Sequence, residues 1–467
     1  MLHQEAFDRL SVKYPEAVMV RATLENALPP TFVDDIFSQH AGRRNSRKLL
    51  FSTVVALLSL VVCRVRNSVH ASYQLMENEL CVGVKAVYNR LNSLPVALIE
   101  ALVRESSLRL FAIVDALQSP LPPIIPGWKT RIVDGNHLAA TEHRIQPLRT
   151  LGGGALPGLG LVVYDAERGL VQRAYLSEDG HEQERSITLR VLEDVEPGEV
   201  WIADRAYATC VFMHEIATQG SYFIVRRHQT NGRIVEQGEW TYCGRTETGE
   251  VYERPGQSID DFGQALDLRI IRLDLFEKTR DGDSSLEILS NLPLDISALT
   301  IAEGFRGRWR IETAFAHLES VFEGEISSLG HPSAALLAFA LALIAYNTLG
   351  IVMTALRKKH GTEKVANEVS HYFLGERVSS AWSAMDLFIE EDRWVTRYAE
   401  KTPQEIATEL LRLVEHVSMR KLKKHPRGKK KPVPKRTCPK DQPHFATSRI
   451  LAAAKAKKNR SKRKAGK

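Results

Sequence analysis

The sequence predicts an α/β protein with a helical N-terminal domain, a mixed α/β region interrupted by a β-rich insertion, and a basic disordered tail. Three observations lead to this prediction. Residues 1–119 carry apolar side chains at helical spacing, residues 120–228 alternate short β-type runs with helical stretches, and lysine and arginine accumulate after residue 420. A chain of 467 residues is long enough for two or three domains, each with its own core.

The N-terminal domain, residues 1–119, is expected to be mostly helical. Apolar residues recur at helical spacing over residues 49–62 and 84–113, and polar turns such as Asn67-Ser68 separate these stretches. A basic group precedes the first apolar stretch and consists of Arg43, Arg44, Arg47 and Lys48. The domain is therefore either a small helical DNA-binding module or a plain helical bundle with a solvated basic edge, and the pattern alone favours neither.

A proline-rich linker at residues 121–126 leads into the sheet region, residues 120–228. The elements expected there are strands at 130–134, 159–165 and 169–176, a helix at 182–193, a strand at 199–203, a helix at 212–218 and a strand at 222–226. Three consecutive strands followed by alternating helix and strand indicate a mixed sheet.

The remaining boundaries follow changes in composition. Residues 229–298 are rich in turns and β-like runs and are predicted to form a β-rich insertion, residues 299–400 read as a helical continuation of the sheet region, and residues 401–467 as a C-terminal helix with a basic tail. Between residues 420 and 467 lie 20 of the 63 lysines and arginines, with Asp441 as the single acid, so this tail should be disordered unless bound. Such concentrated positive charge attracts a polyanion such as nucleic acid.

The apolar run from residue 334 to 356 is long enough to cross a bilayer. Asn347, Thr348 and Gly350 interrupt the run and a charged helical segment precedes it, so we predict a helix buried in the core and no membrane partner. The sequence shows no signal-peptide pattern, and its five cysteines lack the paired spacing of a zinc site or a disulfide framework. A cytoplasmic protein is therefore expected.

Two aspartates follow predicted strands. Asp134 ends a β-type run, and Gly135 would let the backbone leave the sheet at once, while Asp204 follows the strand at 199–203. An α/β sheet usually presents its chemistry at strand ends, and the sheet would bring these two carboxylates into neighbouring places. Taken singly, an aspartate in such a position is more often a turn former or a helix cap.

A glutamate supplies the third carboxylate. Residues 305–319 read as one amphipathic helix. Its buried stripe is predicted to consist of Ile311, Phe315, Leu318 and Phe322. Arg308 lies one turn before Glu312 on an adjacent stripe, and such a pair is usually a surface ion pair. Beside two aspartates at strand ends, Glu312 could instead complete a metal site.

Three sequence blocks together are similar to those of bacterial DDE transposases of the IS-four family, over roughly residues 125–350. They are Asp-Gly-Asn from Asp134, Asp-Arg-Ala-Tyr from Asp204, and the spacing of Phe305, Arg308, Glu312 and Glu319. The family signature has Tyr, Arg, Glu and Lys at the last four places, so Phe305 lacks a hydroxyl and Glu319 reverses a charge. The resemblance implies a ribonuclease-H-like catalytic domain, interrupted by the β-rich insertion and continued in residues 299–400.

The resemblance also implies a reaction. The enzyme would be a metal-dependent DNA transposase that cleaves terminal inverted repeats and joins the 3′-hydroxyls to target DNA, acting as a homodimer that holds both element ends. Asp134, Asp204 and Glu312 would bind two Mg²⁺ ions, which Mn²⁺ can replace, because Mg²⁺ prefers oxygen ligands. Phe305, Arg308 and Arg205 would contact DNA, although Arg205 could equally form a structural ion pair.

Two other functions fit the same sequence. The chain could be an inactive derivative that binds DNA or acts as a repressor, or a ribonuclease-H-like nuclease unconnected with transposition. Metal-dependent cleavage separates the first from a transposase, and joining of DNA ends separates the second. In every case the expected location is the bacterial cytoplasm, at the nucleoid.

Overall fold

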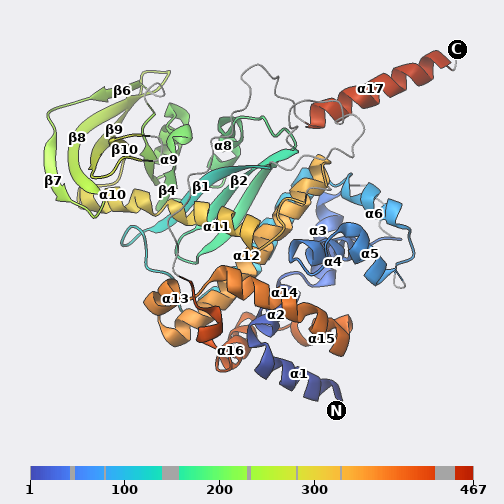
Figure 1. Cartoon of the computed structure of the whole chain (residues 1–467). Coiled ribbons are helices and arrows are strands. Elements are labelled where there is room, and N and C mark those ends of the chain that lie inside the picture. Colours follow the sequence, from blue (N-terminus) through green and yellow to red (C-terminus); the bar gives the residue numbers. More distant parts are fainter. Residues whose placement is uncertain are drawn as a thin grey trace.

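A mixed β-sheet crosses one side of the molecule, and helices from both ends of the chain pack together on the other (Figure 1). The computed structural model describes residues 2–42, 48–77, 80–138, 157–228, 233–279, 282–326, 329–425 and 447–465. The sheet has ten strands in the order β3-β2-β1-β4-β5-β10-β9-β8-β6, and β7 pairs with β8.

The strands comprise β1 (Lys129–Leu138), β2 (Gly158–Asp165), β3 (Leu170–Ser177), β4 (Glu199–Ala203), β5 (Tyr222–Arg226), β6 (Arg233–Glu236), β7 (Thr241–Arg245), β8 (Gly249–Ile259), β9 (Ala265–Leu275) and β10 (Ser285–Ser290). The first three strands pair antiparallel, and β1, β4 and β5 run parallel. This part confirms the predicted mixed sheet.

The helices of the N-terminal part are α1 (Leu2–Lys13), α2 (Pro15–Ala27), α3 (Pro30–His40), α4 (Phe51–Val62), α5 (Val69–Met76), α6 (Val84–Leu91) and α7 (Val96–Leu117). The prediction of a mostly helical region is confirmed, including the turn before α5. Ser68 caps that helix, because its hydroxyl accepts a hydrogen bond from the Ala71 amide.

The later helices are α8 (Glu184–Leu192), α9 (Cys210–Thr218), α10 (Ala298–Arg306), α11 (Trp309–Ser320), α12 (Pro332–His360), α13 (Thr362–Glu368), α14 (His371–Phe388), α15 (Glu391–Tyr398), α16 (Pro403–Val414) and α17 (Thr447–Ala465). Short 3-10 helices lie at Arg205–Tyr207 and Met419–Leu422. Among the described residues, α12 is the one helix whose length and composition would allow it to cross a membrane.

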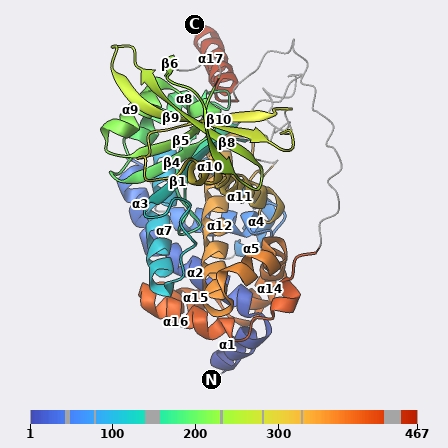
Figure 2. The same ribbon diagram turned by 90° about the vertical axis from the view of Figure 1, so that its left-hand side faces the viewer.

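Helix α12 is the central helix of the core. It packs against α2, α4, α7 and α16 and against strand β3, and 94% of its most apolar window is buried inside the protein. Figure 2 shows it running from the sheet down between the N-terminal and C-terminal helices. Asn347, at mid-helix, is fully buried and hydrogen-bonds both backbone groups of Val171, which fastens the helix to β3. The packing matches the predicted buried core helix.

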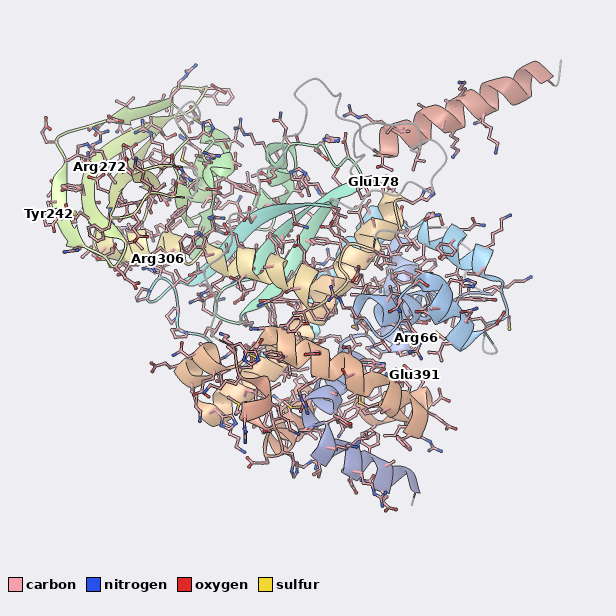
Figure 3. All side chains as sticks on the ribbon, in the orientation of Figure 1. Arg66, Glu178, Tyr242, Arg272, Arg306 and Glu391 are labelled. Carbon is pink, nitrogen blue, oxygen red and sulfur yellow. The ribbon has the colours of Figure 1, made fainter. Side chains whose placement is uncertain are left out.

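The strands of the β-rich insertion continue the central sheet. Strand β10 pairs antiparallel with β5, and β9, β8 and β6 extend the sheet outward from it. Side chains such as Tyr242 and Arg272 project from these outer strands, far from Glu391 at the opposite end of the molecule (Figure 3). Arg306 of α10 pairs with Glu247 at 3.1 Å and so links the insertion to the helices that follow it.

Three local predictions are wrong. Strand β1 does not end at Asp134, because its pairing with β2 continues to Leu138, and Gly135 therefore lies inside the strand. The helix predicted over residues 305–319 is two helices, α10 and α11, which meet at Gly307. The tail is not without structure in its described parts, since Leu422 is buried against α14 and α17 is helical.

The break at Gly307 has a packing cause. A Cβ at this position would collide with the side chain of Ile124, which belongs to the proline-rich linker. The chain turns here through tight hydrogen bonds, from Gly307 N–H to the Gly304 carbonyl and from Arg308 N–H to the Phe305 carbonyl. The turn sets the start of α11 beside β1, where Arg308 contacts Asp134.

Candidate active site

The two aspartates predicted to be neighbours lie side by side on parallel strands. Strands β1 and β4 pair in register up to Val133 and Ala203, and Asp134 and Asp204 are the next residues of each strand. Neighbouring strands lie about 4.8 Å apart, and opposed residues of a parallel pair point to the same face. The parallel pairing therefore ends in two adjacent carboxylates.

The Asp134 carboxylate is fixed by two hydrogen bonds, but few positive charges lie near it among the described residues. Its Oδ1 accepts a hydrogen bond from the Gly135 amide at 3.0 Å, and its Oδ2 accepts one from Arg308 Nη1 at 3.2 Å. Burial raises the pKa of Asp134 to about 7; the charges of Glu184 and Asp204 act in the same direction, whereas Arg308 and the Gly135 amide oppose the rise. Without a metal, the carboxyl is therefore partly protonated near neutral pH.

Arg308 connects Asp134 to Glu312. Its second terminal nitrogen, Nη2, lies 2.5 Å from Glu312 Oε1, so one guanidinium spans the strand aspartate and the helix glutamate. The Arg308 side chain is 11% exposed, whereas the Glu312 side chain is 50% exposed. The guanidinium lies 5.9 Å from the centre of the Phe305 ring. Glu312 is therefore at the site, on the side open to solvent.

Two further side chains lie at the site, although the sequence did not single them out. Glu184, the first residue of α8, lies against Gly135, where an added Cβ would collide with its carboxylate oxygen. Tyr207 is 1% exposed, and its hydroxyl interacts with the Glu184 carboxylate. Burial raises the pKa of Tyr207 well above its usual value, and the charges of Glu184, Asp134 and Asp204 raise it further.

The donor set suits a hard divalent cation. All the acidic groups offer carboxylate oxygens, which Mg²⁺ prefers, and Asp204 Oδ1 is buried without a hydrogen-bond partner. In the part of the chain that the structure describes, no three acids or histidines stand close enough to chelate an ion as they are. Arg308 occupies the space between Asp134 and Glu312, so an ion binding there would displace its guanidinium from at least one of them.

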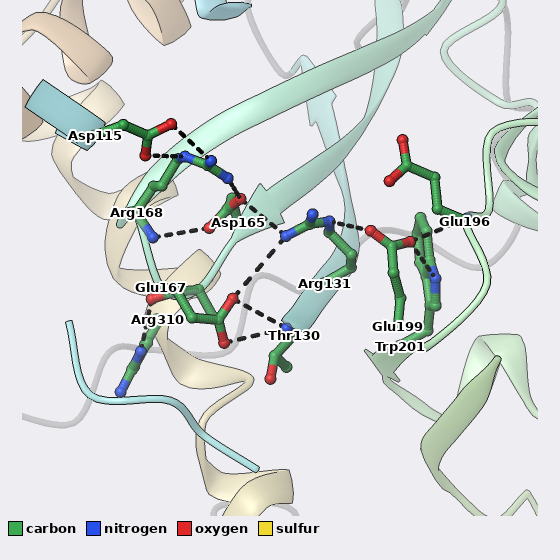
Figure 4. Close-up of polar contacts among 11 residues, drawn as sticks. Asp115, Thr130, Arg131, Asp165, Glu167, Arg168, Glu196, Glu199, Trp201 and Arg310 are labelled. Carbon is green, nitrogen blue, oxygen red and sulfur yellow. Dashed lines mark hydrogen bonds and ion pairs between the residues drawn. The ribbon is translucent and has the colours of Figure 1, made fainter. Parts of the chain in front are cut away.

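A second group of charges lies at the other end of the β1–β4 pairing, around Arg131 (Figure 4). Arg131 Nη1 lies 2.9 Å from Asp165 of β2, and its Nε lies 2.8 Å from Glu199 of β4. The three side chains are at most 5% exposed. Arg168 adds a second guanidinium to Asp165 at 2.9 Å. These ion pairs link the three adjacent strands β2, β1 and β4.

The remaining predicted DNA contacts are scattered. Phe305 is 8% exposed and packs in the core beside Arg308, and its contact with DNA stays a prediction. Arg205 and Lys48 are exposed. Arg43, Arg44 and Arg47 lie outside the described residues. Glu319, at the expected lysine position, is exposed at the end of α11, where its carbonyl accepts a hydrogen bond from Arg64.

Fold and site together define an α/β protein with an acidic centre at the carboxyl ends of parallel strands, approached by a helix-borne glutamate. Residues 129–348 match the model of the transposase DDE domain, and this segment spans the site from Asp134 to Glu312. This segment of the chain is therefore similar to transposase DDE domains.

Comparison with complete proteins adds two findings. No curated protein matches the chain. Among solved structures, the chain is similar to a piggyBac transposase in a synaptic complex with hairpin DNA, solved by cryo-electron microscopy, at 10% identity and a TM-score of 0.37, over 87% of this chain and 86% of that one.

Proposed function

We propose that this chain is an insertion-sequence transposase, which cuts the ends of its element and joins the freed 3′-hydroxyls to target DNA. The observation that carries the proposal is the register of β1 and β4, which sets Asp134 and Asp204 side by side within the segment that matches the DDE domain. Glu312 and its contact with Arg308 supply the third acid expected of such a site. The similarity of the sequence blocks to the IS-four family supports that narrower assignment.

In this proposal Asp134, Asp204 and Glu312 hold two Mg²⁺ ions, for which Mn²⁺ can substitute. Bound there, the ions would activate the attacking water or 3′-hydroxyl and stabilise the leaving oxygen. Asp134 is central to this proposed set, because it neighbours Asp204 through the strand pairing with β4 and Glu312 through Arg308. Asp204 and Glu312 would supply the other carboxylate oxygens.

Arg308 has two roles in the proposal. Before metal binds, its guanidinium balances part of the acidic charge. Once cations take over the carboxylates, the same guanidinium is free to hold a phosphate in bidentate fashion. The exposed Arg205 and Lys48 are further candidates for phosphate contacts, and the basic residues after 420 would add attraction without sequence preference.

The partners proposed are the terminal inverted repeats, target DNA and a second copy of the chain. A homodimer would hold both element ends for one concerted reaction. The expected place of action is the bacterial cytoplasm, at the nucleoid.

A strand-transfer assay tests the function. The full chain is incubated with a labelled duplex that carries the terminal sequence flanking its coding region, with a target plasmid, and with Mg²⁺ or EDTA. We expect metal-dependent nicking at the element end and a labelled product joined to the plasmid. Nicking without joining would identify a nuclease, and binding without nicking would identify an inactive derivative or repressor.

A further inference from the structure

Glu184 lies beside the proposed metal site, on the face of the sheet opposite the helix that carries Glu312. Its helix, α8, buries Ile187 and Val191 in the same cluster as Val133 of β1. Helix α11, which carries Glu312, buries Ile311 in the cluster that contains Ile132. Because adjacent residues of a strand point to opposite faces, α8 and α11 cover opposite faces of β1.

The position of Glu184 is set by the glycine next to Asp134. A Cβ on Gly135 would point toward α8 and collide with Glu184 Oε1. The carboxylate therefore occupies space that any other residue at 135 would fill.

Among the described residues, no lysine or arginine forms an ion pair with Glu184. The buried Tyr207 hydroxyl interacts with the Glu184 carboxylate and belongs to the same acidic group. Asp204 Oδ1 is buried there without a hydrogen-bond partner. A buried polar atom without a partner is uncommon, and this one lies among carboxylates that repel one another.

We propose that Glu184 is a fourth carboxylate of the metal site, reaching the ions from the face of the sheet opposite Glu312, with Tyr207 as its positioning residue. The inference rests on the proposed metal-dependent function. In it, Asp134 and Asp204 lie where the pairing of β1 with β4 ends, and one helix-borne glutamate approaches the site from each face. Gly135 is then required because a side chain there would push the Glu184 carboxylate away.

Metal binding by the full chain tests the role directly. Mn²⁺ affinity is measured by titration, with free Mn²⁺ followed by electron paramagnetic resonance, for wild type, Glu184→Gln and the control Glu193→Gln. The control removes the same charge from the exposed end of α8. Loss of a carboxylate that orients or binds a metal costs about 10- to 100-fold in affinity. We expect that loss in Glu184→Gln and less than a twofold change in Glu193→Gln.

Two more measurements separate a metal-binding role from a structural one. Glu184→Gln should raise the melting temperature of the metal-free protein, because it removes repulsion, and should shrink the rise in melting temperature that Mg²⁺ produces. Gly135→Ala, which keeps all carboxylates, should weaken Mn²⁺ binding, and adding it to Glu184→Gln should have little further effect. Wild-type Mn²⁺ affinity in Glu184→Gln, or a lower melting temperature without metal, would overturn the assignment. Absence of Mn²⁺ binding by the wild type would instead overturn the proposed metal-dependent function.

Discussion

Strand β1 carries two groups of charged side chains that differ in how completely their charges are balanced. Around Arg131, each buried acid contacts a guanidinium, and the exposed edge of the group is closed by Arg168 and Asp115 at 3.0 Å. Around Asp134, the described residues include one arginine, Arg308, that pairs with two carboxylates, those of Asp134 and Glu312. The first group is complete without a ligand. The second has more acids than cations among the described residues, which supports the proposal that it binds a metal.

The largest effect is expected for the acids of the second group. Asp134→Asn, Asp204→Asn or Glu312→Gln should lower metal-dependent cleavage by about a thousandfold or more, because metal stabilisation of the transition state is worth several kcal/mol. Binding to the same DNA should change little, since none of the three is a cation. Cleavage of a labelled element end is measured in Mg²⁺, and binding in Ca²⁺. Full cleavage by any one variant would remove that residue from the site.

A substitution in the group around Arg131 should lower the stability of the fold. Arg131→Met leaves Asp165 and Glu199 buried beside an apolar side chain, and breaking a buried pair in this way costs about 3–5 kcal/mol. Thermal unfolding of the metal-free chain measures the effect. Asp115→Asn is the matched control, because its side chain is 57% exposed and an exposed pair contributes less than about 1 kcal/mol. Equal melting temperatures for Arg131→Met and wild type would show that the buried pairs contribute nothing net.

Asp134→Asn should raise the stability of the metal-free protein at alkaline pH. This change is smaller than that expected for Arg131→Met and opposite in sign. The pKa of Asp134 is raised to about 7, so between about pH 4 and pH 7 the folded state binds more protons than the unfolded state. This carboxyl therefore makes the wild type lose stability as pH rises through that window, and asparagine removes the loss. The variant should match the wild type near pH 3 and melt at a higher temperature at pH 8. A variant that is less stable at pH 8 would mean that the Arg308 contact outweighs burial.

The sequence predicted the elements that local pattern determines. Strand β4 begins and ends at the predicted residues, and the neighbouring places of Asp134 and Asp204 followed from two β-runs that each lead into an aspartate. The end of β1 was missed because Gly135 reads as an exit, whereas pairing with β2 keeps the chain extended to Leu138. The break at Gly307 was missed because it depends on contact with Ile124, far away in the sequence.

Long-range contacts explain what was missed at the site. The helix carrying Glu184 was predicted, but nothing in its sequence distinguishes this acid from Glu182 or Glu193. The proximity of Glu184 to the site results from the packing of α8 against Gly135, which only the three-dimensional structure shows. A usable signal was present, namely a glycine directly after the first aspartate together with an acid at the start of the helix that follows β3. The Arg131 group was missed for the same reason, since Asp165 and Glu199 come from different strands.

The placement of α12 has a consequence for the order in which the chain leaves the ribosome. Its partners α2, α4, α7 and β3 all precede it, and α14 and α16 follow it. When this very apolar helix emerges, most of the surface that will cover it has already been synthesised and can fold first, as N-terminal parts of large proteins do. The aggregation-prone interval is thereby shortened, and a gene fragment that begins after residue 119 would make α12 without α2, α4 and α7, leaving the apolar surface of this helix uncovered.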